Sequence, residues 1–276
     1  IYNMVEYLAG NRIRGTSTEK TALIPAVTLD GTPVRDSIDS GVTSLSESIT
    51  VGDHTNKALV CCIYRQGGGA SGTTAVKVGT NAFTPVQQTF GGSSGTGTQT
   101  TEIWILLNSG ITNDSSNQVD WTGTGSAGGV GRVGIGIYSL YNVNQGGGSN
   151  TFVGSTAYGT IGAGVTASTN GVVNSVASGD FILDNLGANS NTQPTDSLTE
   201  GWNEFVKTNR YFVSQYNASP STNNNMFYSN VTGAEWSWSG ARIKKIAGGS
   251  PTDGSIFYET DNNKSYVLSS NVWTEL

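Results

Sequence analysis

The sequence predicts an all-β protein built around an antiparallel β-sandwich, and three observations support this. Short apolar and β-branched runs recur along the chain, Gly- and Asn-rich turns separate them, and no long segment has helical periodicity. With 276 residues, the chain has room for one large all-β domain or two small ones. We divide it into an N-terminal arm over residues 1–34, a β-sandwich domain over 35–249 and a C-terminal β-hairpin module over 250–276.

The N-terminal arm has the only helix-like pattern, and its apolar residues are candidates for an assembly or anchor surface. Gly10 stands where a helix C-cap would, so the pattern predicts a two-turn amphipathic helix. Such a short helix is marginal in water and should pack on something. Residues 16–19, Thr-Ser-Thr-Glu, match a capping box, although a polar turn is the preferred interpretation. The anchor candidates are Tyr2, Met4, Val5 and Leu8.

From about residue 42 the pattern indicates strands throughout. Residues 42–51 alternate between apolar and polar side chains, whereas residues 58–64 form a continuous apolar run that predicts a central, buried strand. Cys61 and Cys62 are adjacent, so on a strand they point to opposite faces and should remain reduced. Further predicted strands lie at 75–78, 83–86, 102–107, 119–121, 133–138, 181–183, 211–213 and 235–243.

The last 24 residues predict a small β-hairpin unit. Apolar and polar residues alternate before a polar turn at residues 261–264, and a second β-type run follows it. A unit of this size buries too little surface to fold alone. It must therefore dock on a partner chain or on the preceding domain. Phe257, Tyr258 and Trp273 are its candidate assembly residues.

Charge excludes some functions. The net charge is −6, and Lys244–Lys245 is the largest basic cluster, so we expect no nucleic-acid partner. No run approaches 18 apolar residues, so we expect no membrane span. The sequence offers no cofactor motif.

Enzymatic chemistry finds little support. His54 is the single histidine, and beside Asp53 it is interpreted as a turn residue in solvent rather than as part of a triad. Asp and Glu are frequent enough in this chain that pairs of them are expected by chance. A pair of carboxylates that catalyses glycoside hydrolysis is therefore disfavoured. The acids considered are Asp180, Asp184, Glu200, Glu204 and Glu235. We expect a non-enzymatic protein.

Two ligand-binding alternatives stay open. Oxygen-rich loops at residues 113–120 and 261–263 would suit calcium, but neither has EF-hand spacing, and solvated turns are the preferred interpretation. Trp236 and Trp238 lie two apart and so share a strand face. They would most often fill a sandwich core, and less often lie in a subunit interface or form a platform for a glycan.

Three segments resemble proteins of viruses and microbial surfaces. The string DGSIFYETDNNKSYVLSSNVW resembles modules that end tail-fibre and virion surface proteins of phages and environmental viruses. The opening YLAGNRIRGTSTEKTAL resembles leaders of structural proteins of marine viruses. The order of runs over residues 42–247 resembles a β-sandwich domain of phage, bacterial and archaeal surface proteins, with Gly79–Thr84 at its glycine-containing motif. This resemblance implies a jelly-roll-like or lectin-like sandwich, in which residues 141–176 are longer than expected.

We therefore expect a virion structural protein: a fibre, spike or capsid-decorating subunit on the virion surface. It would assemble with copies of itself and with capsid or tail proteins, in a closed oligomer or by strand addition, and it could bind a host-surface glycan. The alternatives are a carbohydrate-binding or adhesive module and a subunit of a cellular extracellular filament.

Overall fold

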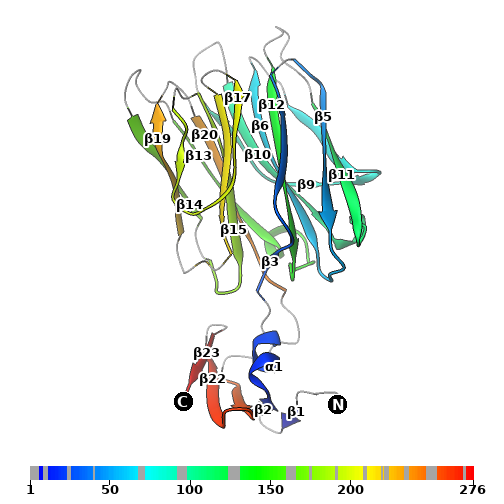
Figure 1. Ribbon diagram of the computed structural model, residues 1–276, viewed down its shortest axis with the longest axis vertical. Helices are drawn as coiled ribbons and strands as arrows, with labels where there is room; N and C mark the ends of the chain where they lie inside the picture. The colour runs from blue at the N-terminus through cyan, green and yellow to red at the C-terminus, as the bar shows by residue number, and fades with distance from the viewer. Residues whose placement is uncertain are drawn as a thin grey trace.

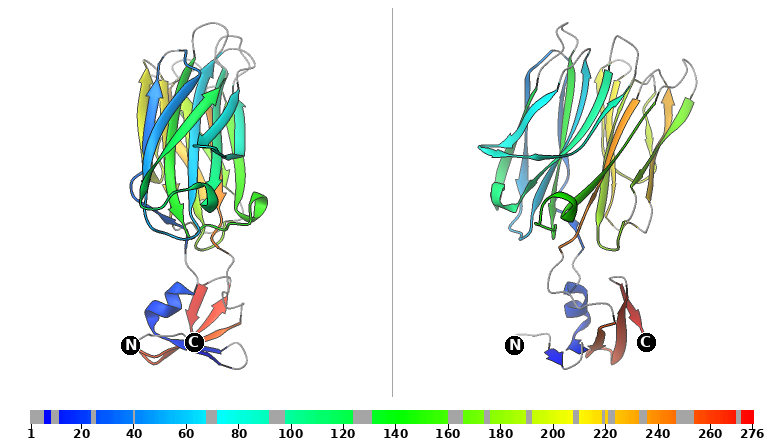
Figure 2. Two further views of the ribbon diagram at one scale, coloured as in Figure 1. Left: turned by 90° about the vertical axis from the view of Figure 1, so that its right-hand side faces the viewer. Right: turned by 180° about the vertical axis from the view of Figure 1, so that it is seen from behind.

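The fold was analysed in a computed structural model (Figure 1). It describes residues 6–8, 12–23, 26–39, 41–67, 72–91, 98–123, 131–159, 166–173, 176–189, 192–207, 210–218, 220, 224–232, 236–246, 254–269 and 272–276. As predicted, the protein is all-β: its strands form several antiparallel sheets, and it has almost no helix. Four sheets form a head, and a fifth forms a small foot below it (Figures 1 and 2).

Two sheets come from the first half of the chain. Sheet I is ordered β5 (Ser44–Val51), β11 (Ser115–Gly123), β7 (Thr73–Val78) and β8 (Asn81–Ala82). Sheet II is ordered β12 (Arg132–Tyr141), β6 (Ala58–Gly67), β10 (Thr98–Leu107) and β9 (Thr84–Gly91). Both β3 (Thr28–Leu29) and β4 (Val34–Ile38) pair with the outer side of β12. A 3₁₀ turn, η1 (Asn108–Gly110), follows β10.

The other two sheets of the head follow in sequence. Sheet III is ordered β13 (Phe152–Gly159), β20 (Trp236–Ile243), β15 (Phe181–Ala188), β18 (Arg210–Asn217) and β17 (Thr199–Lys207). Sheet IV is ordered β14 (Thr166–Val173), β19 (Asn224–Thr232) and β16 (Thr195–Asp196). A 3₁₀ turn, η2 (Gly148–Asn150), precedes β13 and separates the two halves of the head.

The four sheets stack in the order I, II, III, IV, with a layer of buried side chains between each neighbouring pair. Sheets II and III are therefore covered on both faces, which is why central strands such as β6 and β12 are nearly continuous apolar runs instead of alternating ones. Cys61 packs toward sheet I and Cys62 toward sheet III, both as free buried thiols. This confirms the prediction of a central strand with two reduced cysteines on opposite faces.

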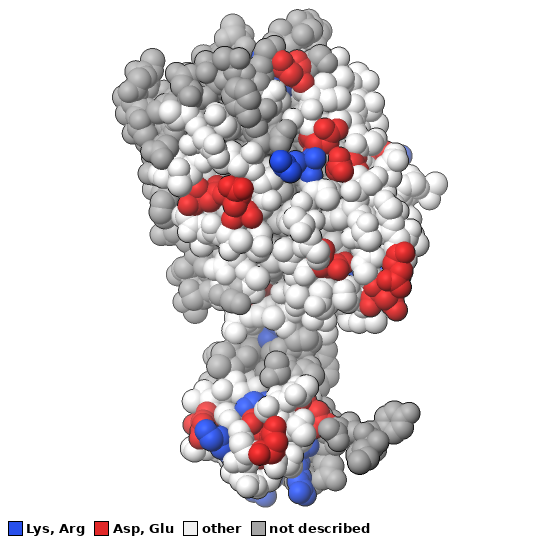
Figure 3. All heavy atoms as spheres, in the orientation of Figure 1, with Lys and Arg blue, Asp and Glu red and all other residues white. Residues whose placement is uncertain are grey.

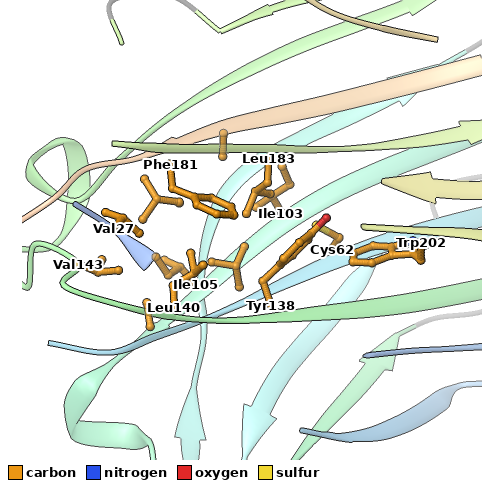
Figure 4. Packing of buried hydrophobic residues seen from close by; sticks show 14 of the residues in the cluster. Val27, Cys62, Ile103, Ile105, Tyr138, Leu140, Val143, Phe181, Leu183 and Trp202 are labelled. Carbon is orange, nitrogen blue, oxygen red and sulfur yellow. The ribbon is translucent and has the colours of Figure 1, made fainter. Parts of the chain in front are cut away.

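The layer between sheets II and III is the largest of the three (Figure 4). Its lower part is dry: Val27, Ile105, Leu140 and Phe181 are buried together. Glycine lets the sheets approach closely beside them, since a Cβ on Gly136 would lie 2.3 Å from the Trp202 ring. The Gly-x-Gly alternation in β12 therefore serves interlayer packing.

The second half of the head repeats the topology of the first. Strands β4, β12, β6, β10 and β9 of sheet II match β13, β20, β15, β18 and β17 of sheet III in both spatial order and chain order. Strands β5, β11 and β7 of sheet I likewise match β14, β19 and β16 of sheet IV. The duplication is therefore a property of the strand topology.

Contacts across the central layer obey a pseudo-twofold relation between the two repeats. Strand β4 lies against β17 and, reciprocally, β13 lies against β9. Strand β12 touches β17 while β20 touches β9, and β6 and β15, which match each other, are in mutual contact. Exchanging the two repeats therefore reproduces these contacts, whereas β10 also lies against β20 and β15 and the matching strand β18 lies less close to β12 and β6. The head resembles an isologous dimer joined into one chain.

The foot is built from both ends of the chain, which meet below the head (Figures 1 and 2). Its sheet is ordered β1 (Glu6–Leu8), β2 (Arg12–Gly15), β21 (Ile256–Glu259), β22 (Lys264–Ser269) and β23 (Val272–Glu275). A helix, α1 (Ser17–Ala22), packs against β21. The two terminal segments, described separately in the sequence analysis, therefore share one sheet.

Several expectations for the arm are wrong. Residues Glu6–Leu8, expected in a helix, form strand β1 because β2 pairs with them antiparallel and satisfies their backbone. Residues 16–19, expected as a polar turn, cap and begin α1. Strand β3 and Val34, placed in the arm, belong to sheet II. The long segment 141–176 holds the first two strands of the second repeat, β13 and β14.

Candidate attachment surface on the foot

The centre of the foot is a parallel pair of strands from opposite ends of the chain. Arg12 to Gly15 in β2 pair in register with Ile256 to Glu259 in β21. The chain beyond β21 continues this contact, since the amide of Thr260 donates to the Gly15 carbonyl over 2.8 Å. Parallel strands require a long connection, and here the connection is the entire head.

A capping box starts α1 and ties it to the C-terminal turn. The Glu19 amide donates to Thr16 Oγ1 over 3.3 Å, and the Thr16 amide donates to Glu19 Oε2 over 2.7 Å. Asp261, in the turn between β21 and β22, accepts from the Ser17 amide over 3.2 Å. That contact lowers the pKa of the Asp261 carboxyl. The turn at residues 261–263, considered for calcium, thus caps a helix.

The covered face of the foot sheet is held by one ion pair and an aromatic contact. Lys20 of α1 pairs with Glu259, whose side chain is almost fully buried, and lies 3.1 Å from the centre of the Tyr266 ring. Phe257 is fully buried, and its ring centroid lies 5.6 Å from that of Trp273. The predicted assembly residues Phe257 and Trp273 therefore pack against each other inside the foot.

The opposite face of the foot sheet is exposed, and we call it the foot face. Strands β2 and β21 both alternate between exposed and buried residues, so their exposed side chains share this face. In register, Arg12 neighbours Ile256 and Arg14 neighbours Tyr258. Val267, half-buried, continues the face beside Ile256. The foot face thus combines two arginines with an apolar strip.

Exposed apolar residues are concentrated in the foot. Among the described residues, four large hydrophobic side chains are exposed, and three of them, Ile256, Tyr258 and Leu276, belong to the foot. The fourth, Val153, lies in β13 of the head. On the face seen in Figure 3, acidic patches dominate the head, while basic and acidic side chains mix on the foot. An apolar strip with arginines is typical of a protein-binding surface.

The structure divides the predicted anchor residues. Tyr258 lies on the foot face, whereas Tyr2, Met4 and Val5 fall outside the described residues, and only the backbone of Leu8 is described, in β1. Arg12, Arg14 and Ile256 were not among the residues predicted from the sequence. Their signal is the two-residue alternation in Arg12–Gly15 and Ile256–Glu259, which becomes informative only once the two strands are known to be neighbours.

The tryptophan pair belongs mainly to the core between sheets III and IV. Trp238 is fully buried, and its indole N–H donates to Asp184 Oδ2 over 2.6 Å; Trp236 is half-buried beside the same core. Asp184 also accepts from the Tyr228 hydroxyl over 2.5 Å and from Gln215. The preferred core interpretation of Trp238 is confirmed, and this ring is not exposed to a sugar.

Burial raises the pKa of the Asp184 carboxyl to about 6, against the opposing effect of its four hydrogen bonds. At the edge of the same layer, burial and the charge of neighbouring Glu200 raise the pKa of the Asp196 carboxyl to about 8. A hydrogen bond between the two side chains adds to this rise. Both acids thus keep their proton to a higher pH than an ordinary aspartate does, Asp196 more so than Asp184.

The other candidate carboxylates have structural partners or are not described. Asp180 pairs with Arg242 over 2.5 Å and accepts from the amides of Ala177 and Lys245. Glu235 lies outside the described residues, and only the backbone of Glu204, in β17, is described. The described contacts place none of these carboxyl groups beside another as a catalytic pair would require.

His54 lies in a loop, as expected, but it is packed against neighbouring side chains and only 33% exposed, which corrects the expectation of a solvated residue. Its ring stacks on Tyr141 with centroids 4.0 Å apart, and its Nε2 lies 3.3 Å from Asp30 Oδ1. Ser139 donates to the other oxygen of Asp30 over 3.0 Å. The carboxylate therefore stands between serine and histidine, whereas nucleophile activation needs the histidine in the middle. Asp53 instead accepts from Asn113.

The segments considered for calcium form no metal site among the described residues. No group of three or more potential metal-ligating side chains occurs among the described residues. Most of residues 113–120, expected as a loop, belongs to strand β11. There Asp120 accepts from Ser46 and Gln118, and Asn117 bonds the backbone of Thr112. No helix in the described part of the chain is long and apolar enough to cross a lipid bilayer.

Comparison of the chain with protein-family models, with curated proteins and with solved structures found no match. The class of the protein therefore rests on its own architecture: a four-layered all-β head with a duplicated topology, carried on a small foot that both chain ends build.

Proposed function

We propose that the chain is a structural subunit of a virion surface, a fibre, spike or capsid-decorating protein, which the foot attaches to the particle. Its partners are other copies of itself and capsid or tail proteins, and its place is the outer surface of the particle. The observation that carries this proposal is the foot face: an apolar strip with two arginines at the end of the molecule where both termini meet.

The architecture of the head supports a display role. Two of its four sheets are buried on both faces, and the buried carboxylate of Asp184 bonds to other core residues. Such interlayer packing makes a rigid body, which suits a surface component that must persist outside cells. The resemblances of both terminal segments to virion proteins point in the same direction.

The strand order further supports assigning each repeat to the jelly-roll class. A jelly roll has eight strands in two sheets; lettered B to I along the chain, one sheet is ordered BIDG and the other CHEF. In the first repeat, β4-β12-β6-β10 follows the first order and β5-β11-β7-β8 the second. Strand β9 departs from the jelly-roll order. It follows β8 along the chain but pairs with β10 at the edge of sheet II. On this assignment the head is two jelly rolls packed back to back.

Cryo-electron microscopy of the native particles that carry this protein tests the proposal. We expect a fixed number of copies on each particle, with Ile256 and Tyr258 buried against a neighbouring subunit and the head pointing outward. A free protein or an open filament without a capsid would contradict the virion assignment. Particles that contact the head while the foot face stays in solvent would contradict the assigned attachment surface.

A pair of variants isolates the foot face. Tyr258→Asp places a charge in the apolar strip, and Val153→Asp makes the same change in the head at nearly equal exposure, 38% against 37%. We expect incorporation into particles to fall at least tenfold for Tyr258→Asp and to stay unchanged for Val153→Asp. Equal incorporation of the two variants would remove the foot face as the attachment site.

A further inference from the structure

The layer between sheets II and III changes character along its length. Its lower part is the dry cluster of Figure 4, but its upper part contains five polar residues that are fully or almost fully buried. They come from β10, β15 and β20, and all point into this layer. We call this group the polar seam: Gln99, Thr101, Asn185, Ser237 and Ser239.

Register places these residues together. Thr101 and Ser239 face each other across the layer, with their hydroxyl oxygens 2.9 Å apart. Asn185 is the strand partner of Ser239 and reaches across to donate to the carbonyls of Ile63 and Glu102. Gln99 lies two residues from Thr101 on β10, and Ser237 lies two residues from Ser239 on β20. Since side chains two apart on a strand share a face, Gln99 and Ser237 also point into this layer.

Some polar atoms of the seam have no protein partner. They are both side-chain polar atoms of Gln99, Oδ1 of Asn185 and Oγ of Ser237, and all three residues are completely buried. Buried polar groups are nearly always hydrogen-bonded to protein or to ordered water, because an unmade bond leaves the cost of desolvation uncompensated. These atoms therefore point to a bound polar ligand between the two repeats.

Their chemistry matches water. The Gln99 amide N–H groups donate, the carbonyl oxygens of Gln99 and Asn185 accept, and the Ser237 hydroxyl does either. A water molecule donates twice and accepts twice, so it can serve both kinds of partner at once. None of the three side chains carries a charge, which disfavours an ion.

We propose that the polar seam is an internal hydration site, in which Gln99, Asn185 and Ser237 bind ordered water at the junction of the two repeats. The contact that the pseudo-twofold relation places opposite the polar seam supports the proposal, because it differs from the seam. There Tyr138 and Ser214 bond directly, 2.6 Å between oxygens, and Ser214 also bonds the Asp184 carbonyl. The Tyr138–Ser214 contact thus leaves neither hydroxyl unpaired, whereas the polar seam has direct bonds, such as Thr101–Ser239, and also unpartnered atoms on Gln99, Asn185 and Ser237.

A high-resolution crystal structure of the full chain tests the site. We expect at least one solvent peak about 2.7–3.2 Å from two or more of the unpartnered atoms. Density for a different molecule, or a Gln99 amide turned onto a protein partner with no solvent peak, would overturn the proposal. This test is independent of the proposed virion role, since it concerns only the interior of the head.

A variant provides a solution measurement. Gln99→Leu removes both unpartnered amide atoms at similar volume, and Gln118→Leu makes the same change on the exposed face of sheet I. Magnetic relaxation dispersion of the solvent counts long-lived internal water. We expect Gln99→Leu to lose at least one such water and Gln118→Leu to lose none. An unchanged count in a folded Gln99→Leu protein would contradict the assignment.

Discussion

Ile13 and Phe257 are register partners on adjacent parallel strands, although nearly the whole chain lies between them. Both side chains are buried on the covered face of the foot sheet. The contact makes the foot dependent on both ends of the chain, because neither β2 nor β21 can bury its apolar residue without the other. It also places the two termini together at one end of the molecule, far from the outer edge of the head (Figures 1 and 2).

The first prediction concerns this contact. Phe257→Ala removes a fully buried ring that packs on Trp273, so we expect the foot to lose about 3–5 kcal/mol of stability. The head has three hydrophobic core layers of its own, so it should keep its fold. Limited proteolysis, followed by mass spectrometry, should show faster cleavage near both chain ends, with an unchanged resistant fragment for the head. The exposed substitution Val153→Ala serves as the control, and cleavage throughout the head would contradict the prediction.

The second prediction concerns the capping box. Thr16→Ala removes the hydroxyl that accepts from the Glu19 amide, so we expect a loss of about 1 kcal/mol from α1. Hydrogen exchange of the α1 amides measures this as faster exchange of roughly fivefold. Thr16→Ser retains the acceptor and should exchange nearly as the wild type does. Equal exchange in the two variants would show that the box contributes nothing.

The sequence predicted the sheets with strong apolar runs and missed those without. Ala58–Gly67 and Arg132–Tyr141 are buried on both faces, so their apolar character is continuous and easy to recognise. The strands at Thr166–Val173 and Asn224–Thr232 are rich in Thr and Asn, and they resemble turns in sequence. The foot face was missed for another reason. A pairing between residues 12–15 and 256–259 is not a local property, so no pattern in either segment reveals it.

The third prediction compares two partners of one hydrogen bond. Ser214→Ala leaves the buried Tyr138 hydroxyl without its 2.6 Å partner, and we expect a cost of about 1–3 kcal/mol. Tyr138→Phe removes the hydroxyl itself, while Ser214 keeps its bond to the Asp184 carbonyl, so its cost should be smaller, about 0.5–1.5 kcal/mol. Chemical denaturation of both variants measures the difference. A larger loss for Tyr138→Phe would contradict the assigned partners.

The fourth prediction concerns pH and the carboxyl pair of Asp196 and Glu200. The pKa of Asp196 is raised to about 8 in the folded protein, so the native state holds a proton that the unfolded chain releases near the ordinary value of 3.8. Stability from this group is therefore full below about pH 4, declines as the pH rises, and levels off above pH 8. Asp196→Asn replaces the carboxyl with a group that never ionises, so it should remove this decline.

Measured at pH 8.5, Asp196→Asn should be more stable than the wild type by about 1–2 kcal/mol, a value reduced for the partial exposure of the site. At pH 4 the two proteins should differ little, because the wild-type carboxyl is already neutral. Denaturation across this pH range decides the matter, with Asp53→Asn on an exposed turn as the matched control. A stability difference that is constant with pH would mean that proton uptake by the Asp196–Glu200 pair is not its cause.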